Sequence, residues 1–282
     1  MKLAFTTLGC PGWSLGTMIS HARQYGYEGI DFRGYQGEME IYRLPEFSTT
    51  LEETKERFME AELEIPCFSS SVRLFTESKE EQKKYLEELK QYADLCEYFE
   101  TPFIRVFGGS IGDHGRGEAV DIAAENTAEY LKVIEGRPVT LLLETHDDWT
   151  SCQVAQELLS RVDSSQLEVL WDVHHPYRTL GEEPEQTWNV LGKHIRYTHW
   201  KDSYVKEDHK RGYQLCLLGD GDLPLYRMYR LLKDEGYQGY FTLEWEKVWC
   251  PEIEEPEIAF KQYAHFMKKL EQQVSSGPTM KF

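Results

Sequence analysis

The sequence predicts an α/β protein folded as a single (β/α)8 TIM barrel. Eight short apolar runs alternate with longer amphipathic stretches along 282 residues, and a barrel of this type takes about 250 residues. No linker rich in Pro, Gly or Ser divides the chain. We therefore expect one domain over residues 1–273, followed by a flexible C-terminal tail at 274–282.

The eight apolar runs have the composition of strands buried on both faces, because they are brief and rich in Val, Ile, Leu and aromatic residues. They occupy residues 2–7, 29–33, 65–71, 103–107, 139–145, 167–173, 195–200 and 240–245. The first run is too short and too rich in threonine for a signal peptide, and none approaches the ~20 residues of a membrane span. The sequence thus predicts a soluble, cytoplasmic protein.

Helices are predicted between the strands, where apolar residues recur at i, i+3, i+4 and i+7. Two such patterns are Leu15, Met18, Ile19, Ala22 and Leu225, Met228, Tyr229, Leu232. Ser14 and Asp222 are expected to cap the N-termini of these two helices. Gly26 and Gly236 are expected to end them in the left-handed conformation that glycine adopts without strain.

The charge balance and the cysteines narrow the class of protein. The chain carries 31 Lys and Arg against 49 Asp and Glu, a formal net charge of −18. A surface of this sign repels phosphates, so neither nucleic acid nor an anionic membrane is expected as a partner. The six cysteines include no Cys-x-x-Cys pair, which disfavours a zinc ribbon or a redox motif and favours reduced thiols.

Four successive predicted strands end in polar residues, namely Glu144, Asp172, His199 and Glu244. The first three are spaced by 28 and 27 residues, about one βα unit each, and an added loop lengthens the last interval. The active site of a parallel barrel lies at the C-terminal ends of its strands, so we expect these side chains to meet in one mouth. A single acid near a strand end is usually a solvated loop residue. Three carboxylates and an imidazole on consecutive strands instead predict a site for Mn²⁺, Mg²⁺ or Co²⁺.

Four motifs make the sequence similar to the xylose-isomerase-like barrels of the sugar phosphate isomerase/epimerase superfamily. That superfamily also holds sugar epimerases, inosose and dehydroshikimate dehydratases, and apurinic endonucleases. The motifs are Glu144-x-His146, Trp171-Asp172-x-x-His175, His199-x-Lys201-Asp202, and Gly219-Asp220-Gly221-Asp222 before Gly236-Tyr237-x-Gly239 and Glu244. The resemblance runs over nearly the whole chain.

The resemblance implies a role for each matching residue. Glu144, Asp172, His199 and Glu244 match the ligands of one divalent cation, for which we expect Mn²⁺, with Mg²⁺, Co²⁺ or Zn²⁺ as alternatives. Glu144 and Glu244 also match the catalytic acid/base pair, and His175 matches a ligand of a substrate hydroxyl. The implied function is an isomerase or epimerase of a small sugar or polyol, in carbohydrate metabolism.

The chemistry would pass through an enediolate. This species is unstable in water, and a metal on the carbonyl and adjacent hydroxyl oxygens stabilises its developing charge. One glutamate abstracts the proton next to the carbonyl, and the other returns a proton to the opposite face or to the neighbouring carbon.

Further residues are candidates for contact with substrate. His146 is expected on the same strand face as Glu144, where the alternative role is support of the metal ligands. Strand alternation would select His174, whereas the family pattern selects His175, and we follow the pattern because the strand is ending. Lys201 is expected to stabilise an alkoxide or an anionic substrate group, with Asp202 as a structural partner.

Other polar and aromatic residues leave two interpretations open. Asp31 and Arg33 are expected to line the mouth, and Arg105 either does so or forms a buried salt bridge. Glu246 and Lys247 either reach the rim or lie on the surface. The glycine-rich stretch 108–117 is either a lid or a plain loop. Aromatic walls for a sugar, or core packing, are the two roles open to Trp13, Trp149 and Trp249.

Departures from the family pattern keep several functions in view. Val205 and Thr150 stand where ketohexose 3-epimerases carry an arginine and a second glutamate, so a ketohexose of that type is not expected as substrate. The main alternative is a dehydratase of a cyclic keto-polyol, of the inosose or dehydroshikimate type. An apurinic endonuclease is disfavoured by the acidic charge, and a non-catalytic sugar-binding protein by the four ligands. No phosphate cradle is found, and a homo-oligomer remains open.

Overall fold

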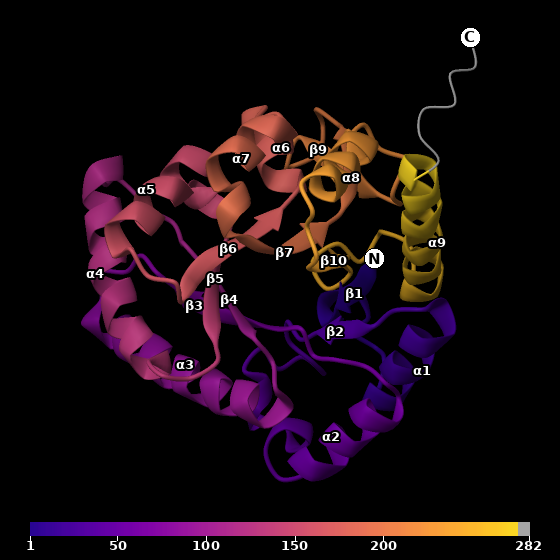
Figure 1. Ribbon diagram of the computed structural model, residues 1–282, viewed down its shortest axis with the longest axis horizontal. Coiled ribbons are helices and arrows are strands. Elements are labelled where there is room, and N and C mark those ends of the chain that lie inside the picture. The colour runs from indigo at the N-terminus through magenta and orange to yellow at the C-terminus, as the bar shows by residue number, and fades with distance from the viewer. Residues whose placement is uncertain (276–282) are drawn as a thin grey trace.

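A ring of parallel strands lies at the centre of the molecule and helices surround it (Figure 1), in a computed structural model that describes residues 1–275. Its strands are β1 (Lys2–Thr6), β2 (Gly29–Asp31), β3 (Cys67–Arg73), β4 (Phe103–Phe107), β5 (Thr140–Glu144), β6 (Leu167–Asp172), β7 (Ile195–Trp200) and β10 (Tyr240–Leu243). Hydrogen bonds join them in the order β2-β1-β10-β7-β6-β5-β4-β3. Isolated parallel bridges from Gly29 to Glu64 and from Phe32 to Phe68 complete the ring. The predicted (β/α)8 barrel is confirmed.

The helices form the outer layer of the barrel. They are α1 (Leu15–Tyr25), α2 (Leu51–Glu60), α3 (Lys79–Phe99), α4 (Arg116–Ile134), α5 (Cys152–Val162), α6 (His174–Leu180), α7 (Pro184–Leu191), α8 (Leu225–Asp234) and α9 (Pro256–Ser275). Short 3₁₀ turns lie at Thr7–Gly9, Ile41–Arg43, Pro45–Phe47, Asp147–Trp149 and Gly192–His194. Within residues 1–275, no helix combines the length and apolarity needed to cross a bilayer.

The predicted ends of several elements differ from the observed ones. Ser14 caps α1, accepting a hydrogen bond from the backbone N–H of Thr17 at 3.1 Å, and Gly26 ends it at φ +82°. The predicted cap at Asp222 is wrong, because α8 begins after Pro224 and the Asp222 carboxylate instead pairs with Arg178. The predicted tail begins inside α9, and its remainder, residues 276–282, lies outside the described residues.

An antiparallel hairpin was not predicted in the loop before the last barrel strand. It consists of β8 (Asp202–Val205) and β9 (Tyr213–Cys216) and continues directly from the end of β7. The Asp202 carboxylate ties it to the loop before α8, accepting hydrogen bonds from the backbone N–H groups of Gly219 (2.8 Å) and Gly221 (3.1 Å). This supports the expected structural role of Asp202. A hairpin built on the end of β7 forms part of the wall above the barrel.

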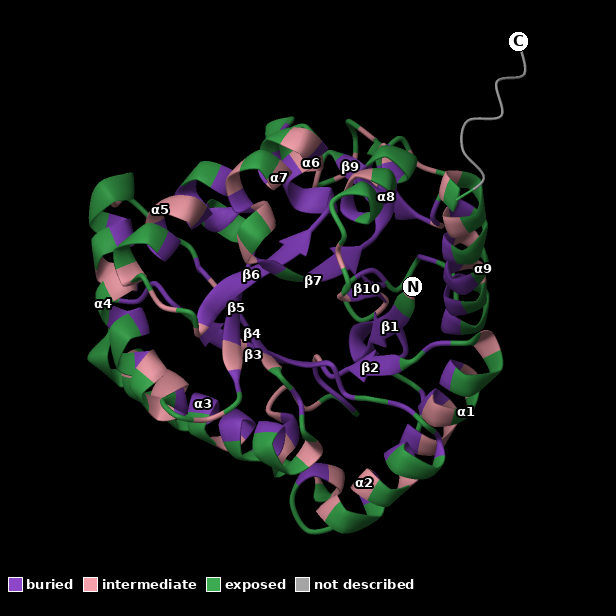
Figure 2. Cartoon of the chain, viewed as in Figure 1, coloured by how far each residue is buried: buried purple, intermediate pink, exposed green. Residues whose placement is uncertain are grey.

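Two layers of apolar side chains stabilise the fold. The strands are buried almost throughout, and the helices alternate buried inner and exposed outer faces (Figure 2). One core cluster lies between strands and helices, and a smaller one unites Ala4, Cys67, Leu142, Leu170, Tyr197 and Tyr240 inside the ring. All six cysteines are buried and free. Because side chains alternate along a strand, the residues two positions beyond Leu142, Leu170 and Tyr197 also face inward, one layer higher.

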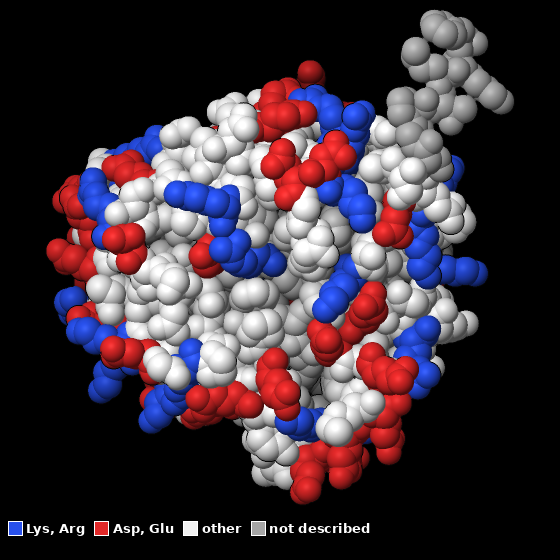
Figure 3. Space-filling model, in the orientation of Figure 1, with Lys and Arg blue, Asp and Glu red and all other residues white. Residues whose placement is uncertain are grey.

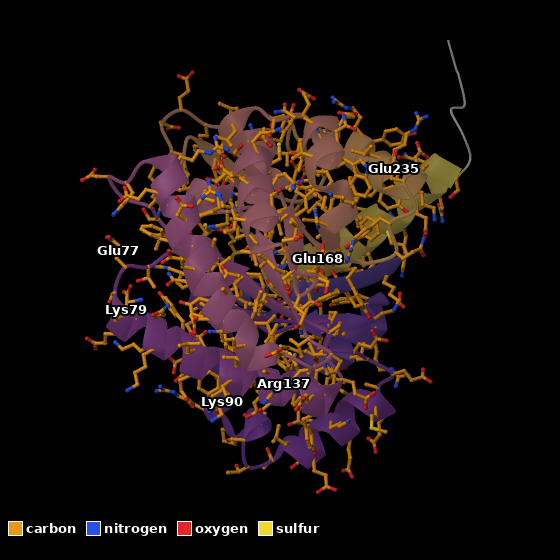
Figure 4. All side chains as sticks on the ribbon, turned by 60° about the vertical axis from the view of Figure 1, so that its left-hand side comes forward. Glu77, Lys79, Lys90, Arg137, Glu168 and Glu235 are labelled. Carbon is orange, nitrogen blue, oxygen red and sulfur yellow. The ribbon has the colours of Figure 1, made fainter. Side chains whose placement is uncertain are left out.

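The charged side chains outside the barrel are mixed in sign. Lys and Arg lie among Asp and Glu over the face seen in Figure 3. Figure 4 shows Glu77 at the periphery of the molecule, where its carboxylate lies 3.2 Å from Nε2 of His114 in the glycine-rich loop. This loop is therefore held from outside by a surface contact. Exposed pairs of this kind contribute little to stability.

Candidate metal centre and cavity

The layer above the inner apolar cluster brings the four predicted metal ligands together. Glu144 ends β5, Asp172 ends β6 directly opposite His199 of β7, and Glu244 follows β10. One donor atom from each side chain lies within 4.8 Å of the others, and all four residues are buried. Parallel register thus converts four distant sequence positions into one cluster.

The His199 ring is held by carboxylates on both of its nitrogens. Nδ1 lies 3.0 Å from Oε1 of Glu144 and 3.4 Å from Oε1 of Glu244. On the other side, Nε2 lies 3.3 Å from Oδ2 of Asp31. The other oxygen of this carboxylate, Oδ1, accepts a hydrogen bond from Ser69 Oγ at 2.8 Å. A carboxylate behind a histidine fixes the ring orientation and raises its basicity as a ligand. Nδ1 is therefore the atom presented to the cluster.

Lys201 closes the other side of the cluster. Its Nζ lies 2.6 Å from Oδ2 of Asp172 and 3.3 Å from Oε1 of Glu246, and it also pairs with Glu244. The lysine is completely buried. Burial lowers its pKa, but the carboxylates, Asp172 first, raise it well above the ordinary value, so the ammonium stays charged. Lys201 is therefore a buried counter-charge to these acids.

The cluster contains more buried acids than permanent cations. Asp31, Glu144, Asp172, Glu244 and Glu246 are buried, against Arg105 and Lys201 among the buried bases that contact them. This excess of negative charge shifts the pKa values of individual groups in the cluster. Burial and the neighbouring Glu244 and Glu144 outweigh Lys201 and raise the pKa of Asp172 to about 6.

Glu144 and His199 shift in the directions that keep both charged. Burial acts to raise the pKa of Glu144, but Arg105 and His199 outweigh it and lower the pKa to about 2. For His199, burial acts to lower the pKa, and Glu244, Asp31 and Glu144 together raise it well above the ordinary value. The carboxylates around His199 therefore stabilise its protonated form, and the cations around Glu144 stabilise its ionised form.

This donor set fits a divalent cation. Buried acids without full compensation are costly, and a bound cation would supply the missing charge. The Oε2 atom of Glu144 is buried and makes no hydrogen bond in the described structure. Three carboxylates and one imidazole match the ligand preferences of Mn²⁺, Mg²⁺ or Zn²⁺.

A cavity of about 830 Å³ opens above the cluster. Glu244 lines it, whereas Glu144 lies deeper and is 1% exposed. The predicted substrate contacts His146, His175, Arg105 and Glu246 also line it, as do Arg33 and Trp249. Lys201 lies beneath the lining, where it contacts Glu244 and Glu246. The structure therefore places the predicted substrate contacts at or directly below one cavity.

The two adjacent histidines diverge because β6 ends at Asp172 and α6 begins at His174. Nε2 of His174 contacts Ser203 Oγ at 2.9 Å, away from the cavity. His175 lines the cavity, and its Nε2 lies 3.5 Å from Oδ2 of Asp172 without a hydrogen bond. Strand alternation could not be extended here, since the backbone had already turned helical.

The structure corrects the expected place of Asp31 and decides between the two roles left open for Lys247, Trp13 and Trp149. Asp31 supports His199 inside the barrel and is absent from the cavity lining. Lys247 is used structurally, donating to the carbonyl of Pro251 at 2.8 Å. Trp13 and Trp149 are buried outside the lining, where Trp13 donates to Glu257 and Trp149 to the carbonyl of Gly109.

Sequence reasoning missed two arginines of the cavity wall. Arg73 ends β3, and Arg211 lies in the hairpin between β8 and β9. Arg73 ends the observed strand but lies two residues beyond the predicted run 65–71, so the predicted strand was too short to include it. Arg211 has no sequence signal, since its place depends on a hairpin that the sequence did not reveal.

Comparison with known proteins agrees with the fold. The family model described as a xylose isomerase-like TIM barrel matches residues 19–270. The chain therefore belongs to this family.

Its curated relatives include two dehydratases. The chain is 26% identical to the 3-dehydroshikimate dehydratase of Bacillus anthracis over 198 residues, covering 67% of this chain and 66% of the relative. It is 30% identical to the inosose dehydratase of Bacillus licheniformis over 145 residues, covering 45% and 46%. The matches thus span less than two thirds of these relatives' lengths. Both relatives are enzymes by name.

Among solved structures, the IOLI protein with a zinc atom superposes with a TM-score of 0.77 at 19% identity, over 99% of this chain and 100% of that chain. This similarity shows the shared fold.

Proposed function

We propose that this chain is a divalent-metal-dependent enzyme that removes a proton from the carbon next to the carbonyl of a small polyhydroxylated ketone. The meeting of Glu144, Asp172, His199 and Glu244 at the floor of an 830 Å³ cavity carries this proposal. These four residues would hold the cation, Mn²⁺ in the first instance, which when bound supplies Lewis-acid polarisation of substrate oxygens. The partner is a small sugar or polyol, and neither nucleic acid nor membrane is involved.

The two proposed acid/base residues, Glu144 and Glu244, lie at different depths below the cavity. Glu244 lines the cavity, so its carboxylate is within reach of a carbon-bound proton above the cluster. Glu144 lies deeper, with Arg105 Nε 3.5 Å from its Oε2. Arg105 and His199 keep Glu144 ionised, so it is present as the carboxylate that a base requires, and the same lowering of its pKa makes it a weaker base.

His175 serves as a neutral partner for a substrate hydroxyl. Burial, followed by Lys201, lowers its pKa well below the ordinary value, so the ring is uncharged. His175 lines the cavity, and its Nε2 is buried without a hydrogen-bond partner in the described structure, 3.5 Å from Oδ2 of Asp172. A hydroxyl can satisfy this atom, which is otherwise costly to leave buried and unpaired.

The same enediolate has two outcomes. Return of a proton gives an isomer or epimer, and loss of a β-hydroxyl gives a dehydrated product. His146 favours dehydration. Its Nδ1 lies 2.8 Å from Oδ1 of Asp147. Burial acts to lower the pKa of His146, but this carboxylate raises it above the ordinary value. A cationic imidazole beside the cavity can protonate a departing hydroxyl. The names of both curated relatives point the same way.

The test is incubation of the Mn²⁺-loaded enzyme with a panel of keto-sugars, inososes and 3-dehydroshikimate in D₂O. Deuterium in a recovered isomer supports isomerisation or epimerisation. A new conjugated product absorbing in the ultraviolet supports dehydration. Absence of both across the panel, with every metal tried, contradicts the proposed function.

A further inference from the structure

Four arginines line the cavity of this acidic protein, together with four acids, Asp147, Asp148, Glu244 and Glu246. Arg33 follows β2, Arg73 ends β3 and Arg105 lies within β4, and all three line the cavity. These strands are neighbours around the ring, with β3 hydrogen-bonded to β4 and bridged to the chain just after β2. Three arginines from neighbouring strands therefore line the cavity of a chain whose net charge is −18.

Arg105 is buried with unused hydrogen-bond donors. It is 1% exposed, and its Nε and Nη1 make no hydrogen bond in the described structure. Its guanidinium lies 3.8 Å from the centre of the Phe107 ring. Its ion-pair contact is with Glu144, at 3.5 Å. A buried guanidinium with unmet donors is costly unless a ligand satisfies them.

Arg33 adds a second positive charge beside it. Its guanidinium lies 5.7 Å from the centre of the same Phe107 ring, and Nη1 donates to Ser71 Oγ at 3.0 Å. Burial first, and Arg105 second, lower the pKa of Arg33 to about 10. The carboxylates of Glu88 and Glu144 oppose this shift and offset part of the repulsion between the two guanidinium groups. An anion bound beside both groups would offset more of it.

The cation proposed above bears on the charge of Arg105, because the two would share one carboxylate. Glu144 is both the counter-charge of Arg105 and a member of the metal cluster. A cation bound at the cluster would share the charge of Glu144 and so weaken the compensation of Arg105. Arg211 on the hairpin side differs, since its Nη1 pairs with Oε2 of Glu246 at 2.7 Å.

We infer that Arg33, Arg73 and Arg105 form a subsite for an oxyanion carried by the substrate, a carboxylate or a phosphate. Guanidinium groups bind both by charge-assisted, often bidentate hydrogen bonds. This inference rests on the proposed function and narrows it to ketones that carry an acidic group. It separates the two named types of substrate, since 3-dehydroshikimate has a carboxylate and an inosose has none.

The experiment compares probes that differ chiefly in charge. Binding of shikimate and of methyl shikimate to the Mn²⁺-loaded protein is measured by calorimetry, alongside glucose 6-phosphate and glucose. We expect at least one acidic probe to bind more tightly than its neutral counterpart by about 10-fold or more. The pair that shows the preference identifies the oxyanion as carboxylate or phosphate.

Two arginine variants test which side of the cavity causes the preference for acidic probes. Arg33→Gln, which leaves the contacts of Glu144 in place, is expected to bring the ratio of acidic to neutral affinity close to one. Arg211→Gln is the matched control, because it removes the same charge from the opposite wall and is expected to preserve the ratio. Equal binding within both pairs, no binding of any probe, or an equal loss in the two variants overturns the subsite.

These outcomes are independent of the metal chemistry. Deuterium exchange without a preference for acidic probes would reject the subsite and retain the proposed function. A preference for acidic probes without metal-dependent exchange on any ketone would retain the subsite and reject the proposed function.

Discussion

Nε2 of His199 lies 3.3 Å from Oδ2 of Asp31, and this contact leaves Nδ1 of the ring facing Glu144 and Glu244. The two residues are 168 positions apart in the sequence. Asp31 is itself held by Ser69, so the orientation of the imidazole is fixed from the opposite side of the barrel.

Replacement of Asp31 by Asn is expected to weaken metal binding by about 10- to 100-fold, because the carboxylate that orients His199 is lost. The affinity for Mn²⁺ is measured by calorimetry, and circular dichroism checks the fold. Asp234→Asn, an exposed change of the same charge on α8, serves as control. Unchanged affinity in Asp31→Asn would show that His199 needs no support.

Replacement of Glu144 or Glu244 by Gln is expected to lower turnover by about 100-fold or more, because each removes a group that accepts or returns the proton. Both variants should lose solvent deuterium exchange, and excess Mn²⁺ should not restore it. If saturating metal recovers the rate of either variant, that glutamate serves the metal alone.

Replacement of Lys201 by Met is expected to destabilise the metal-free protein by about 3–5 kcal/mol, because buried carboxylates lose their counter-charge. Chemical denaturation gives the free energy of unfolding. Addition of Mn²⁺ should raise it more in the variant than in the wild type. Lys84→Met, which breaks an exposed pair with Glu80, is the control and should change stability by less than about 0.5 kcal/mol. An equal loss of unfolding free energy in both variants would show that Lys201 does not compensate the buried carboxylates.

Glu88 on α3 predicts a pH dependence of stability. Burial raises its pKa, although the backbone N–H of Ser71 donates to its carboxylate at 2.7 Å. A carboxyl whose pKa is higher in the folded state stabilises the fold below its unfolded pKa, and this contribution is lost as pH rises through the folded pKa.

Relative to wild type, Glu88→Gln should therefore become more stable as the pH rises from roughly 4 to roughly 7. Denaturation at several pH values measures the difference. Glu87→Gln, on the exposed face of the same helix, reports the effect of net charge alone. A constant difference between Glu88→Gln and wild type would contradict the prediction.

Replacement of Gly108 by Ala is expected to destabilise the protein by about 1–3 kcal/mol, because the packing there has no room for a methyl group. A Cβ on Gly108 would lie 1.9 Å from Cγ of the buried Trp149. Gly117→Ala is the matched control, since no atom lies within 4 Å of its Cβ position and it is in the first turn of α4. Thermal unfolding of the two variants should separate them, and equal melting temperatures would show that Trp149 can move aside.

The sequence by itself determined the barrel and the four residues of the candidate metal cluster. Apolar runs of strand length and a polar residue at the end of each are local patterns, and a parallel barrel places all strand ends at one edge. Glu144, Asp172, His199 and Glu244 could therefore be predicted together. Local patterns also gave Ser14 and Gly26 as the ends of α1.

Tertiary structure alone decided what each polar side chain contacts. The role of Asp31 depends on the far side of the ring, and the choice between His174 and His175 depends on where β6 turns into helix. The row formed by Arg33, Arg73 and Arg105 exists because three strands lie side by side, although their arginines are 40 and 32 residues apart in the chain. Electrostatic interactions act across space, and only folding sets the distances between these charges.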